Sequence, residues 1–210
     1  MCLKLILEVR LELCKNRVRS RTKMSLELIV GPMFAGKSSA ILSRVRRART
    51  LEWKCYIVTN IMDTRYDASG VSVMTHDKEG ISAVGAKELI PLTQEQEYKD
   101  AKLVIIEEGQ FFPDLFEFVI QAVEKDQKDV VVVGLDGDSD RKPFGKILDL
   151  IPYCDKLTKL TSLCKRCGDG TPALFSACVK GNKNGQQVCV GGSDMYEPMC
   201  RKHYLENQNH

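Results

Sequence analysis

The chain has 210 residues, of which 43% are hydrophobic and 28% charged, the composition of a globular protein with enough apolar surface for one core. The net charge is +3, but residues 1–23 carry seven Lys or Arg against two Glu, so the remainder has 24 basic and 26 acidic residues. A slightly negative body argues against general nucleic-acid binding, and no apolar run reaches the roughly 18 residues that span a bilayer, so we expect a soluble protein.

Residues 1–23 form a basic N-terminal extension that alternates apolar and charged residues and then ends in a basic run. An extra strand, a targeting segment and a disordered arm all fit this pattern. Glu8 and Glu12 count against a mitochondrial presequence, which is poor in acids. No motif in the extension demands order, so we expect the compact domain to begin at Met24.

From Met24 onward, short apolar runs alternate with amphipathic patterns. Strands are predicted at residues 26–30, 54–60, 102–108 and 129–137, and helices at 38–52 and 114–128. Continuous Val and Ile runs separated by helices predict an α/β fold with a parallel sheet covered on both faces. After Pro152, glycines, cysteines and polar residues replace the helical periodicity. We therefore expect an α/β domain over residues 24–155 and a small, loop-rich lobe over 156–210.

Residues 31–38 read GPMFAGKS, with the spacing G-x-x-x-x-G-K-S, between the first strand and the first helix. Gly31 and Gly36 allow the backbone to approach phosphate oxygens, and the amides of residues 34–38 point inward at a helix N-terminus. Lys37 can reach the β- and γ-phosphates of a nucleotide, and the Ser38 hydroxyl can ligate Mg²⁺. The alternative is a glycine-rich turn without a ligand, but the flanking strand and helix favour a P-loop.

The run at residues 102–108 ends in two carboxylates, Glu107 and Glu108. Because side chains alternate along a strand, adjacent acids point to opposite faces of the sheet. One can organise Mg²⁺ beside the P-loop, while the other can face a substrate and take a hydroxyl proton during phosphoryl transfer. The alternative is that both end the strand at the solvent boundary.

The C-terminal lobe contains two pairs of metal-ligand residues. Cys164 and Cys167 form C-x-x-C, Cys200 and His203 form C-x-x-H, and 32 residues separate the pairs. This spacing predicts a closed, tetrahedral Cys₃His site for a structural Zn²⁺. A redox C-x-x-C motif or a coincidence would leave the second pair unexplained. Reduced thiols with a metal site also fit the odd total of nine cysteines, and they predict a cytoplasmic protein.

With these motifs assembled, the chain resembles the type II thymidine kinases of animal cytosol, bacteria and large DNA viruses. The matching stretches run in order over about residues 25–205: GPMFAGKS (31–38), DTRY (63–66), THD (75–77), EEGQFFPD (107–114), LDG…RKPFG (135–145), GG-x-D-x-Y (191–196) and the two zinc pairs. The resemblance implies a RecA-like P-loop domain with a zinc-stapled lobe. It also implies the reaction ATP + thymidine → ADP + dTMP with Mg²⁺, in a homotetramer inhibited by dTTP and with no nucleic-acid or membrane partner.

The resemblance also implies residue roles. Glu108 matches the catalytic base that deprotonates the thymidine 5′-hydroxyl. The residues matched to ATP and Mg²⁺ binding are Gly31, Pro32, Met33, Phe34, Ala35, Gly36, Lys37, Ser38, Asp63, Arg65, Glu107 and Gln110. Those matched to thymidine binding are Met33, Phe111, Leu135, Ser139, Phe144, Gln187, Val188, Cys189, Val190, Gly191 and Tyr196. Of these, residues 187–191 belong to a lasso loop that grips the base and is stapled by the zinc site.

Three positions and the length of one loop depart from the family pattern. Glu107 replaces the usual Asp, which extends the carboxylate by about 1.5 Å. Ser139 replaces an aromatic residue over the thymine, a loss on the order of 1 kcal/mol in nucleoside affinity. The loop after Cys167 is about two residues longer than in the animal enzymes, and His203 stands where those enzymes have Cys. Either ligand type binds zinc.

Three rival hypotheses stay open at this point. Ser139 favours a pyrimidine deoxynucleoside kinase of broader specificity. A P-loop with a zinc lobe also fits an ATP-dependent nucleic-acid binding module, although the near-neutral body and the lack of clustered aromatic and basic residues argue against it. Glu107 and Ser139 together fit an inactive paralogue that retains the fold.

Overall fold

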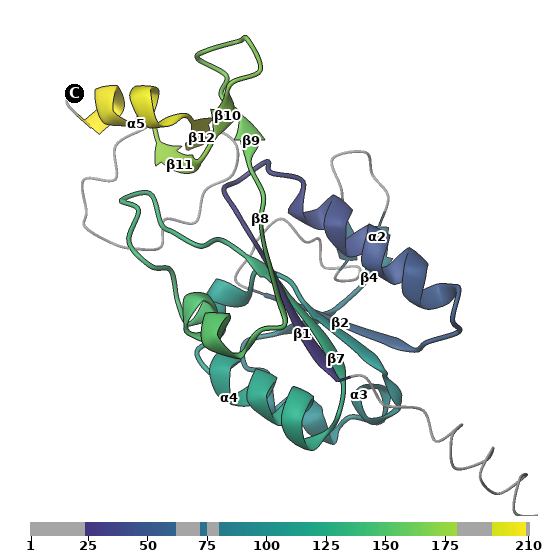
Figure 1. Cartoon of the computed structure of the whole chain (residues 1–210). Coiled ribbons are helices and arrows are strands. Elements are labelled where there is room, and N and C mark those ends of the chain that lie inside the picture. Colours follow the sequence, from purple (N-terminus) through teal and green to yellow (C-terminus); the bar gives the residue numbers. More distant parts are fainter. Residues whose placement is uncertain (1–23, 62–71, 75–79, 180–194, 209–210) are drawn as a thin grey trace, which may run out of the picture.

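The structure is a computed structural model that describes residues 24–61, 72–74, 80–179 and 195–208 (Figure 1). The N-terminal extension, Asp63, Arg65 and the predicted lasso residues 187–191 lie outside the described residues.

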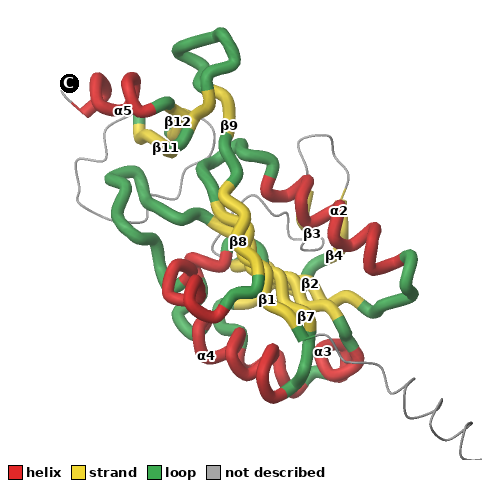
Figure 2. The backbone as a smooth tube through the Cα atoms, viewed as in Figure 1, coloured by secondary structure: helices red, strands yellow, loops and turns green. Residues whose placement is uncertain are grey.

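The core of the molecule is a six-stranded parallel sheet, which confirms the predicted fold class (Figure 2). In spatial order the strands are β5 (Val84–Ala86), β2 (Cys55–Asn60), β6 (Leu103–Ile106), β7 (Asp129–Gly134), β1 (Ser25–Val30) and β8 (Lys156–Lys159). Every neighbouring pair is parallel. The carboxyl ends of β6, β7 and β1 therefore lie side by side, at the edge where open α/β sheets bind their ligands.

Helices cover both faces of the sheet because the strands carry apolar side chains on both. Helix α2 (Lys37–Arg49) buries Ile41 and Val45 against one face, where alternate strand residues such as Ile105 form the core. Helix α4 (Leu115–Ile120) packs against the other face. It continues as the π-helical segment η3 (Gln121–Lys125). Both predicted helices are thus present, although each ends about three residues before its predicted end.

Shorter elements complete the α/β domain. They are the 3₁₀ segments η1 (Ile90–Gln94), η2 (Gly109–Phe111) and η4 (Ile147–Tyr153), the helix α3 (Gln96–Asp100), and the hairpin of β3 (Ser72–Met74) with β4 (Gly80–Ser82).

An ion-pair cluster ties the first strand to the helix that follows it. The Arg44 guanidinium donates hydrogen bonds of 2.8 and 2.6 Å to the two carboxylate oxygens of Glu27. Lys156 of β8 adds a third contact of 2.8 Å to the same carboxylate. The hydrogen bond from Arg44 outweighs the effect of burial and, with Lys156, lowers the pKa of Glu27 to about 2. The cluster therefore joins β1, α2 and β8 through one carboxylate.

Strand β8 extends the sheet past residue 155, where we expected the α/β domain to end. Residues 156–159 pair in parallel with residues 27–30 of β1. Their sequence, KLTK, has no apolar run, because an edge strand is open to solvent on one side and carries charged residues there. Only two residues separate the end of β8, the last strand of the sheet in the sequence, from the next strand, which begins at Ser162.

The described residues of the C-terminal lobe form two short hairpins and a helix. Strands β9 (Ser162–Leu163) and β10 (Pro172–Ala173) form one hairpin, and β11 (Phe175–Cys178) and β12 (Tyr196–Met199) form the other. Helix α5 (Arg201–Gln208) follows. Figure 1 shows the lobe beyond the carboxyl ends of the sheet strands, next to the loop that joins β1 to α2. The lobe is thus placed at the ligand-binding edge of the sheet.

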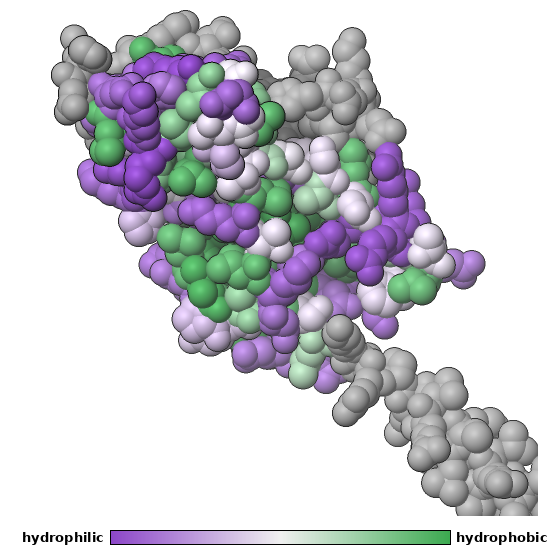
Figure 3. Space-filling view, turned by 45° about the horizontal axis from the view of Figure 1, so that its top comes forward, coloured by the Kyte–Doolittle hydropathy of each residue, from purple (hydrophilic) through white to green (hydrophobic). Residues whose placement is uncertain are grey.

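Apolar side chains remain exposed near the outer edge of the sheet. Ile151 and Tyr153 of η4 and Leu157 of β8 expose 40%, 51% and 45% of their surface. Figure 3 shows apolar residues gathered on the face of the molecule below the hydrophilic lobe.

None of the helices in the described part of the chain combines the length and apolar character that a membrane span requires.

Candidate active site and metal centre

The P-loop follows β1 directly, and two glycines allow its path. A Cβ atom on Gly31 would lie 2.6 Å from the backbone oxygen of Leu160, the residue that follows β8, so only glycine fits this close approach. Gly36 has a left-handed backbone, with φ of 79°, at the N-cap of α2. The residues between them therefore curl around the start of the helix.

The start of α2 has the electrostatics of an anion site. Its first turn contains no acidic residue, whereas Arg46, Arg47 and Arg49 lie in its last turn. The partial positive charge of the helix N-terminus is therefore not neutralised from within the helix. The Lys37 ammonium donates hydrogen bonds to the carbonyl oxygens of Pro32 at 2.8 Å and Gly31 at 3.2 Å, which places a cation over the loop.

Glu107 joins the P-loop to the end of β6. Its carboxylate accepts a hydrogen bond of 3.1 Å from the Ser38 hydroxyl, and the residue is only 6% exposed. Its own amide donates to the carbonyl of Val58 in β2, at 2.8 Å. A buried carboxylate beside a hydroxyl offers the hard oxygen ligands that Mg²⁺ requires. In the structure, Glu107 is thus the acid of the pair that contacts the P-loop.

Glu108 has a different hydrogen-bond partner from Glu107, for a reason other than strand alternation. Strand β6 ends at Ile106, so both acids lie beyond it, and Glu108 has a left-handed backbone with φ of 53°. Such a conformation is unfavourable for a residue with a Cβ and is found preferentially at functional sites. The Glu108 carboxylate accepts a hydrogen bond of 2.6 Å from the Gln110 side chain. A strained turn, rather than the pleat of a strand, thus separates the two carboxylates.

The structure brings together part of the predicted thymidine site. Phe111 and Phe144 form an edge-to-face pair, with ring centroids 5.3 Å apart and an interplanar angle of 83°. The Leu135 amide donates to the Gln110 side-chain oxygen, at 2.9 Å. Tyr196 begins β12, opposite Cys178. The lasso residues that the resemblance adds to this site lie outside the described residues.

Two contacts between the lobe and the α/β domain were not predicted from sequence. The hydroxyl of Ser176 accepts a hydrogen bond of 2.9 Å from the Met33 amide in the P-loop. The hydroxyl of Tyr204 donates one of 2.6 Å to the carbonyl of Ser139. Both join residues more than 60 positions apart, and no local sequence signal indicates either. They attach the lobe to the P-loop and to the loop after β7.

A cation–aromatic stack reinforces the second of these contacts. The Arg141 guanidinium lies 4.5 Å from the ring centroid of Tyr204 and 5.5 Å from that of Phe175. Arg201 lies over the same Phe175 ring, at 5.2 Å. The loop after β7 is therefore held against the lobe by polar and aromatic contacts together.

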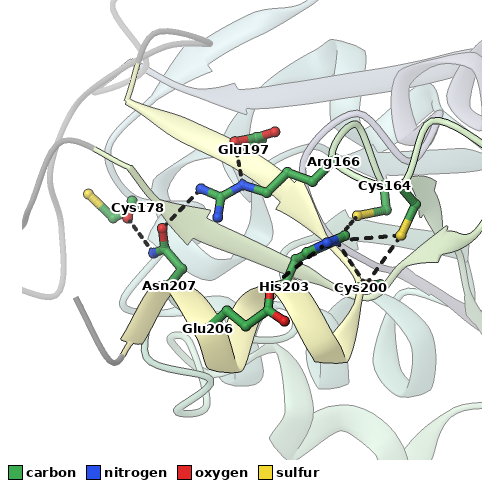
Figure 4. Close-up of polar contacts among 9 residues, drawn as sticks. Cys164, Arg166, Cys178, Glu197, Cys200, His203, Glu206 and Asn207 are labelled. Carbon is green, nitrogen blue, oxygen red and sulfur yellow. Dashed lines mark hydrogen bonds and ion pairs between the residues drawn. The ribbon is translucent and has the colours of Figure 1, made fainter.

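The four predicted zinc ligands converge in the lobe (Figure 4). The Nδ1 atom of His203 lies 3.4 Å from the sulfur atoms of Cys164 and Cys167 and 3.5 Å from that of Cys200. The sulfurs of Cys167 and Cys200 are 3.7 Å apart. In a tetrahedral zinc site, S–N and S–S separations are about 3.5 and 3.8 Å, given the usual bond lengths. The donor set therefore fits Zn²⁺ in both chemistry and geometry.

The environment of the cluster favours at least one thiolate. Burial raises the pKa of Cys164, but hydrogen bonds from the Cys200 backbone and from His203 outweigh it and bring the pKa to about 6. Burial raises the pKa of Cys167 to about 11, with further contributions from the neighbouring Cys164 and Cys200 thiols. A bound cation would draw all three sulfurs into the thiolate form that zinc requires.

A second layer of polar contacts surrounds these ligands. Arg166, between the two cysteines of the first pair, contacts Glu197 of β12 at 3.5 Å and Asn207 of α5 at 3.1 Å (Figure 4). Asn207 in turn donates to the carbonyl of Cys178, at 3.2 Å. His203 Nε2 lies 3.9 Å from Glu206. These contacts tie the metal-binding turn to both strands of the β11–β12 hairpin and to α5.

Comparison with known proteins agrees with this arrangement. A family model described as thymidine kinase matches residues 24–204. The thymidine kinase of variola virus is 39% identical over 182 residues, covering 87% of this chain and 97% of the viral protein. The thymidine kinase of Oryza sativa subsp. japonica is 39% identical over 187 residues, covering 87% of this chain and 67% of the plant protein.

A further viral relative and one solved structure complete the comparisons. The thymidine kinase of vaccinia virus (strain Western Reserve) is 37% identical over 185 residues, covering 87% of this chain and 97% of the viral protein. A DNA replication initiation factor structure shares 10% identity at a TM-score of 0.42, over 73% of this chain and 45% of that chain, a likeness too low to bear on function. The P-loop, the carboxylates after β6, the Cys₃His cluster and the family match over residues 24–204 show that the chain belongs to the thymidine kinase family.

Proposed function

We propose that this thymidine kinase uses Glu108 as the general base that activates the thymidine 5′-hydroxyl. The observation that carries the proposal is the convergence of the P-loop with the turn after β6, through the hydrogen bond from Ser38 to Glu107. In the reaction, the 5′-oxygen forms a bond to the γ-phosphorus while the bond from that phosphorus to the β–γ bridging oxygen breaks, and ADP leaves. Glu108 accepts the proton that the hydroxyl loses.

The P-loop residues bind the triphosphate in this proposal. The amides at the start of α2 and the Lys37 ammonium hold the β- and γ-phosphates. Ser38 and Glu107 would hold Mg²⁺, which neutralises charge on the phosphates when bound. The roles predicted for Asp63 and Arg65 also stay proposals, because these residues lie outside the described part of the chain.

The thymidine pocket is proposed to include the Phe111–Phe144 pair, Leu135 and Tyr196. Ser139 contributes its backbone carbonyl to the contact with Tyr204, so its side chain is not required for that contact. The proposed lasso begins after β11 and returns at β12, and both strands belong to the lobe that the Cys₃His cluster staples. A structural zinc ion therefore supports the pocket without entering the chemistry.

We propose a division of the chain into the extension at 1–23, a P-loop domain that ends after β8, and a zinc lobe from Ser162 onward. The contacts of β8 with β1 support this boundary over one at residue 155. A cytoplasmic location stays a proposal that rests on the metal-type spacing of the cysteines.

We also propose a homotetramer that is inhibited by dTTP, as the family resemblance implies. The exposed apolar residues of η4 and β8 support association, and the occupant proposed for this surface is a second copy of the chain. Inhibition by dTTP is consistent with a site that accepts both a thymine nucleoside and a triphosphate.

The test of the proposed function is phosphate transfer from ATP to a panel of nucleosides, with the native chain and with Glu108→Gln. The native chain is expected to phosphorylate thymidine in preference to deoxycytidine. The variant is expected to lose on the order of 100-fold or more in kcat while its affinity for ATP stays within about twofold. Undiminished turnover by Glu108→Gln would remove Glu108 as the base. Equal use of thymidine and deoxycytidine would favour the broader specificity that Ser139 suggests.

A further inference from the structure

Gln110 lies in the short turn η2, two residues after the proposed base. It is only 4% exposed, and both polar atoms of its carboxamide have partners. The resemblance matches Gln110 to ATP binding, a prediction that stays untested. In the structure the carboxamide instead connects Glu108, at the end of β6, with Leu135, at the end of β7.

The orientation of this carboxamide is fixed by chemistry. The Leu135 amide can only donate a hydrogen bond, so the side-chain atom 2.9 Å from it must be the Gln110 oxygen. The Gln110 nitrogen must then face Glu108, where it donates a hydrogen bond of 2.6 Å to the carboxylate oxygen Oε2. One carboxylate oxygen is thereby fixed, and rotation of the carboxylate is restrained.

Two glycines approach Gln110 closely. A Cβ atom on Gly134 would lie 2.3 Å from the Gln110 side-chain oxygen, and one on Gly145 would lie 2.1 Å from its backbone oxygen. Neither approach leaves room for a side chain, so both strand β7 and the RKPFG segment close around this residue. The surrounding fold therefore accommodates Gln110 specifically.

We propose that Gln110 is a positioning residue that holds the Glu108 carboxylate in the orientation needed to accept the thymidine hydroxyl proton. The inference rests on the proposed role of Glu108. Because the other end of the carboxamide is bound to Leu135, a predicted thymidine-pocket residue, the base and the nucleoside pocket are joined through one side chain. Gln110 thus couples the seating of the nucleoside to the alignment of the base.

The first test replaces Gln110 by Met, which has a similar shape but neither donates nor accepts a strong hydrogen bond. The Gln110→Met variant is expected to lose on the order of 10- to 100-fold in kcat, with the ATP KM changed less than about twofold. The matched control is Gln96→Met on the exposed surface of α3, which is expected to retain native activity. Rates are referred to the folded fraction from thermal unfolding. Native kcat in Gln110→Met would overturn the proposal.

The second test separates positioning of Glu108 from simple anchoring of the turn. Gln110→Glu keeps an acceptor for the Leu135 amide but presents a like charge to Glu108 in place of a donor. If Gln110 positions the base, Gln110→Glu is expected to be less active at neutral pH than Gln110→Met, because the two carboxylates repel. If Gln110 only anchors the turn, Gln110→Glu retains native activity, and the proposal fails.

A double-mutant cycle with Glu108→Gln distinguishes the failure of this proposal from that of the proposed function. If Gln110 acts through Glu108, then adding Gln110→Met to Glu108→Gln is expected to lower the residual kcat by less than about twofold. A further loss equal to that of the single variant would show that Gln110 acts independently and would overturn the positioning role alone. Undiminished activity in Glu108→Gln itself would overturn the assignment of the base.

Discussion

At the scale of single residues, the length of the Glu107 side chain decides whether its carboxylate contacts the P-loop. Glu107 reaches the Ser38 hydroxyl at 3.1 Å across the gap between β6 and the P-loop. An aspartate, which the family resemblance implies at this position, is shorter by about 1.5 Å. The hydrogen bond to Ser38 therefore depends on the longer side chain in this chain.

We predict that Glu107→Asp separates the carboxylate from Ser38 and weakens the proposed Mg²⁺ site. The Mg²⁺ concentration that gives half-maximal activity is expected to rise several-fold, whereas the thymidine KM stays the same. Kinetics over a Mg²⁺ titration measure this, with Glu124→Asp on the exposed end of η3 as the matched control. An unchanged Mg²⁺ dependence would show that Glu107 does not hold the metal.

Sequence could predict which residue types form this site but not how they are oriented. The residue types and spacing of the P-loop, the acid pair and the four metal ligands each indicate one kind of site. The position of Gln110 depends on the Leu135 amide, 25 residues further along the chain, and on the space left at Gly134 and Gly145. No local pattern contains that information. The left-handed backbone of Glu108 is also set by tertiary contacts, since glutamate has no intrinsic preference for it.

At the scale of secondary-structure elements, the burial of a strand determines whether its sequence predicts it. Strands β1, β2, β6 and β7 are mostly apolar, most completely in LVII of β6 and VVVV of β7, because both of their faces are covered. Strand β8 and the strands of the lobe have two to four residues and mixed polarity, so they carry no comparable signal. The predicted ends of the two helices, at residues 52 and 128, lie about three residues beyond the observed ends.

The carboxylate shared by β1, α2 and β8 gives these elements a pH dependence. The pKa of Glu27 falls from its ordinary value of 4.5 to about 2 because of Arg44 and Lys156. A carboxyl group whose pKa is lower in the folded state stabilises the fold fully at pH values above its unfolded-state pKa. For Glu27 this contribution is lost as the pH falls from about 4.5 through 2. We predict that Glu27→Gln lowers the Tm at pH 6 and that the loss shrinks toward pH 2. Thermal unfolding across this range tests it, and a loss independent of pH would contradict it.

At the scale of the whole molecule, the zinc lobe is attached to the catalytic edge by a few specific contacts. Ser176 meets the P-loop at Met33, Tyr204 meets the loop after β7 at Ser139, and the Ser162 hydroxyl donates to the carbonyl of Phe34 at 3.1 Å. The lobe therefore contacts both the proposed phosphate site and the proposed nucleoside pocket. Its own core is small, so a metal bound by the Cys₃His cluster would supply much of its stability.

We predict that Cys164→Ser releases zinc and raises the thymidine KM at least tenfold, because the lobe no longer holds the pocket. The P-loop domain is expected to keep its fold and its ATP affinity within a few-fold, since the sheet has its own core. Zinc content, nucleotide binding and far-UV circular dichroism measure the three effects. Retention of native thymidine affinity after zinc loss would contradict the role of the lobe.

The exposed apolar residues near β8 give a test of assembly. We predict that Leu157→Lys shifts the proposed tetramer to a smaller species, because a lysine ammonium cannot be buried there without a partner. Light scattering coupled to size exclusion measures the mass. Leu163→Lys, at an exposed position of β9 in the lobe, is the control and is expected to leave assembly intact. An unchanged tetramer in Leu157→Lys would exclude this surface as an interface.

The close approach of Gly31 to Leu160 determines where this chain tolerates a change of length. Only Leu160 and Thr161 connect β8 to β9, and the Leu160 amide donates to the carbonyl of Val30 beside the P-loop. An inserted residue there would turn Ser162 away from Phe34 and displace the lobe. The turn after Cys167 is different, because a Cβ atom added to Gly168 or Gly170 would have no neighbour within 4 Å. Extra residues can therefore be accommodated in that turn, whereas the two-residue connection keeps its length.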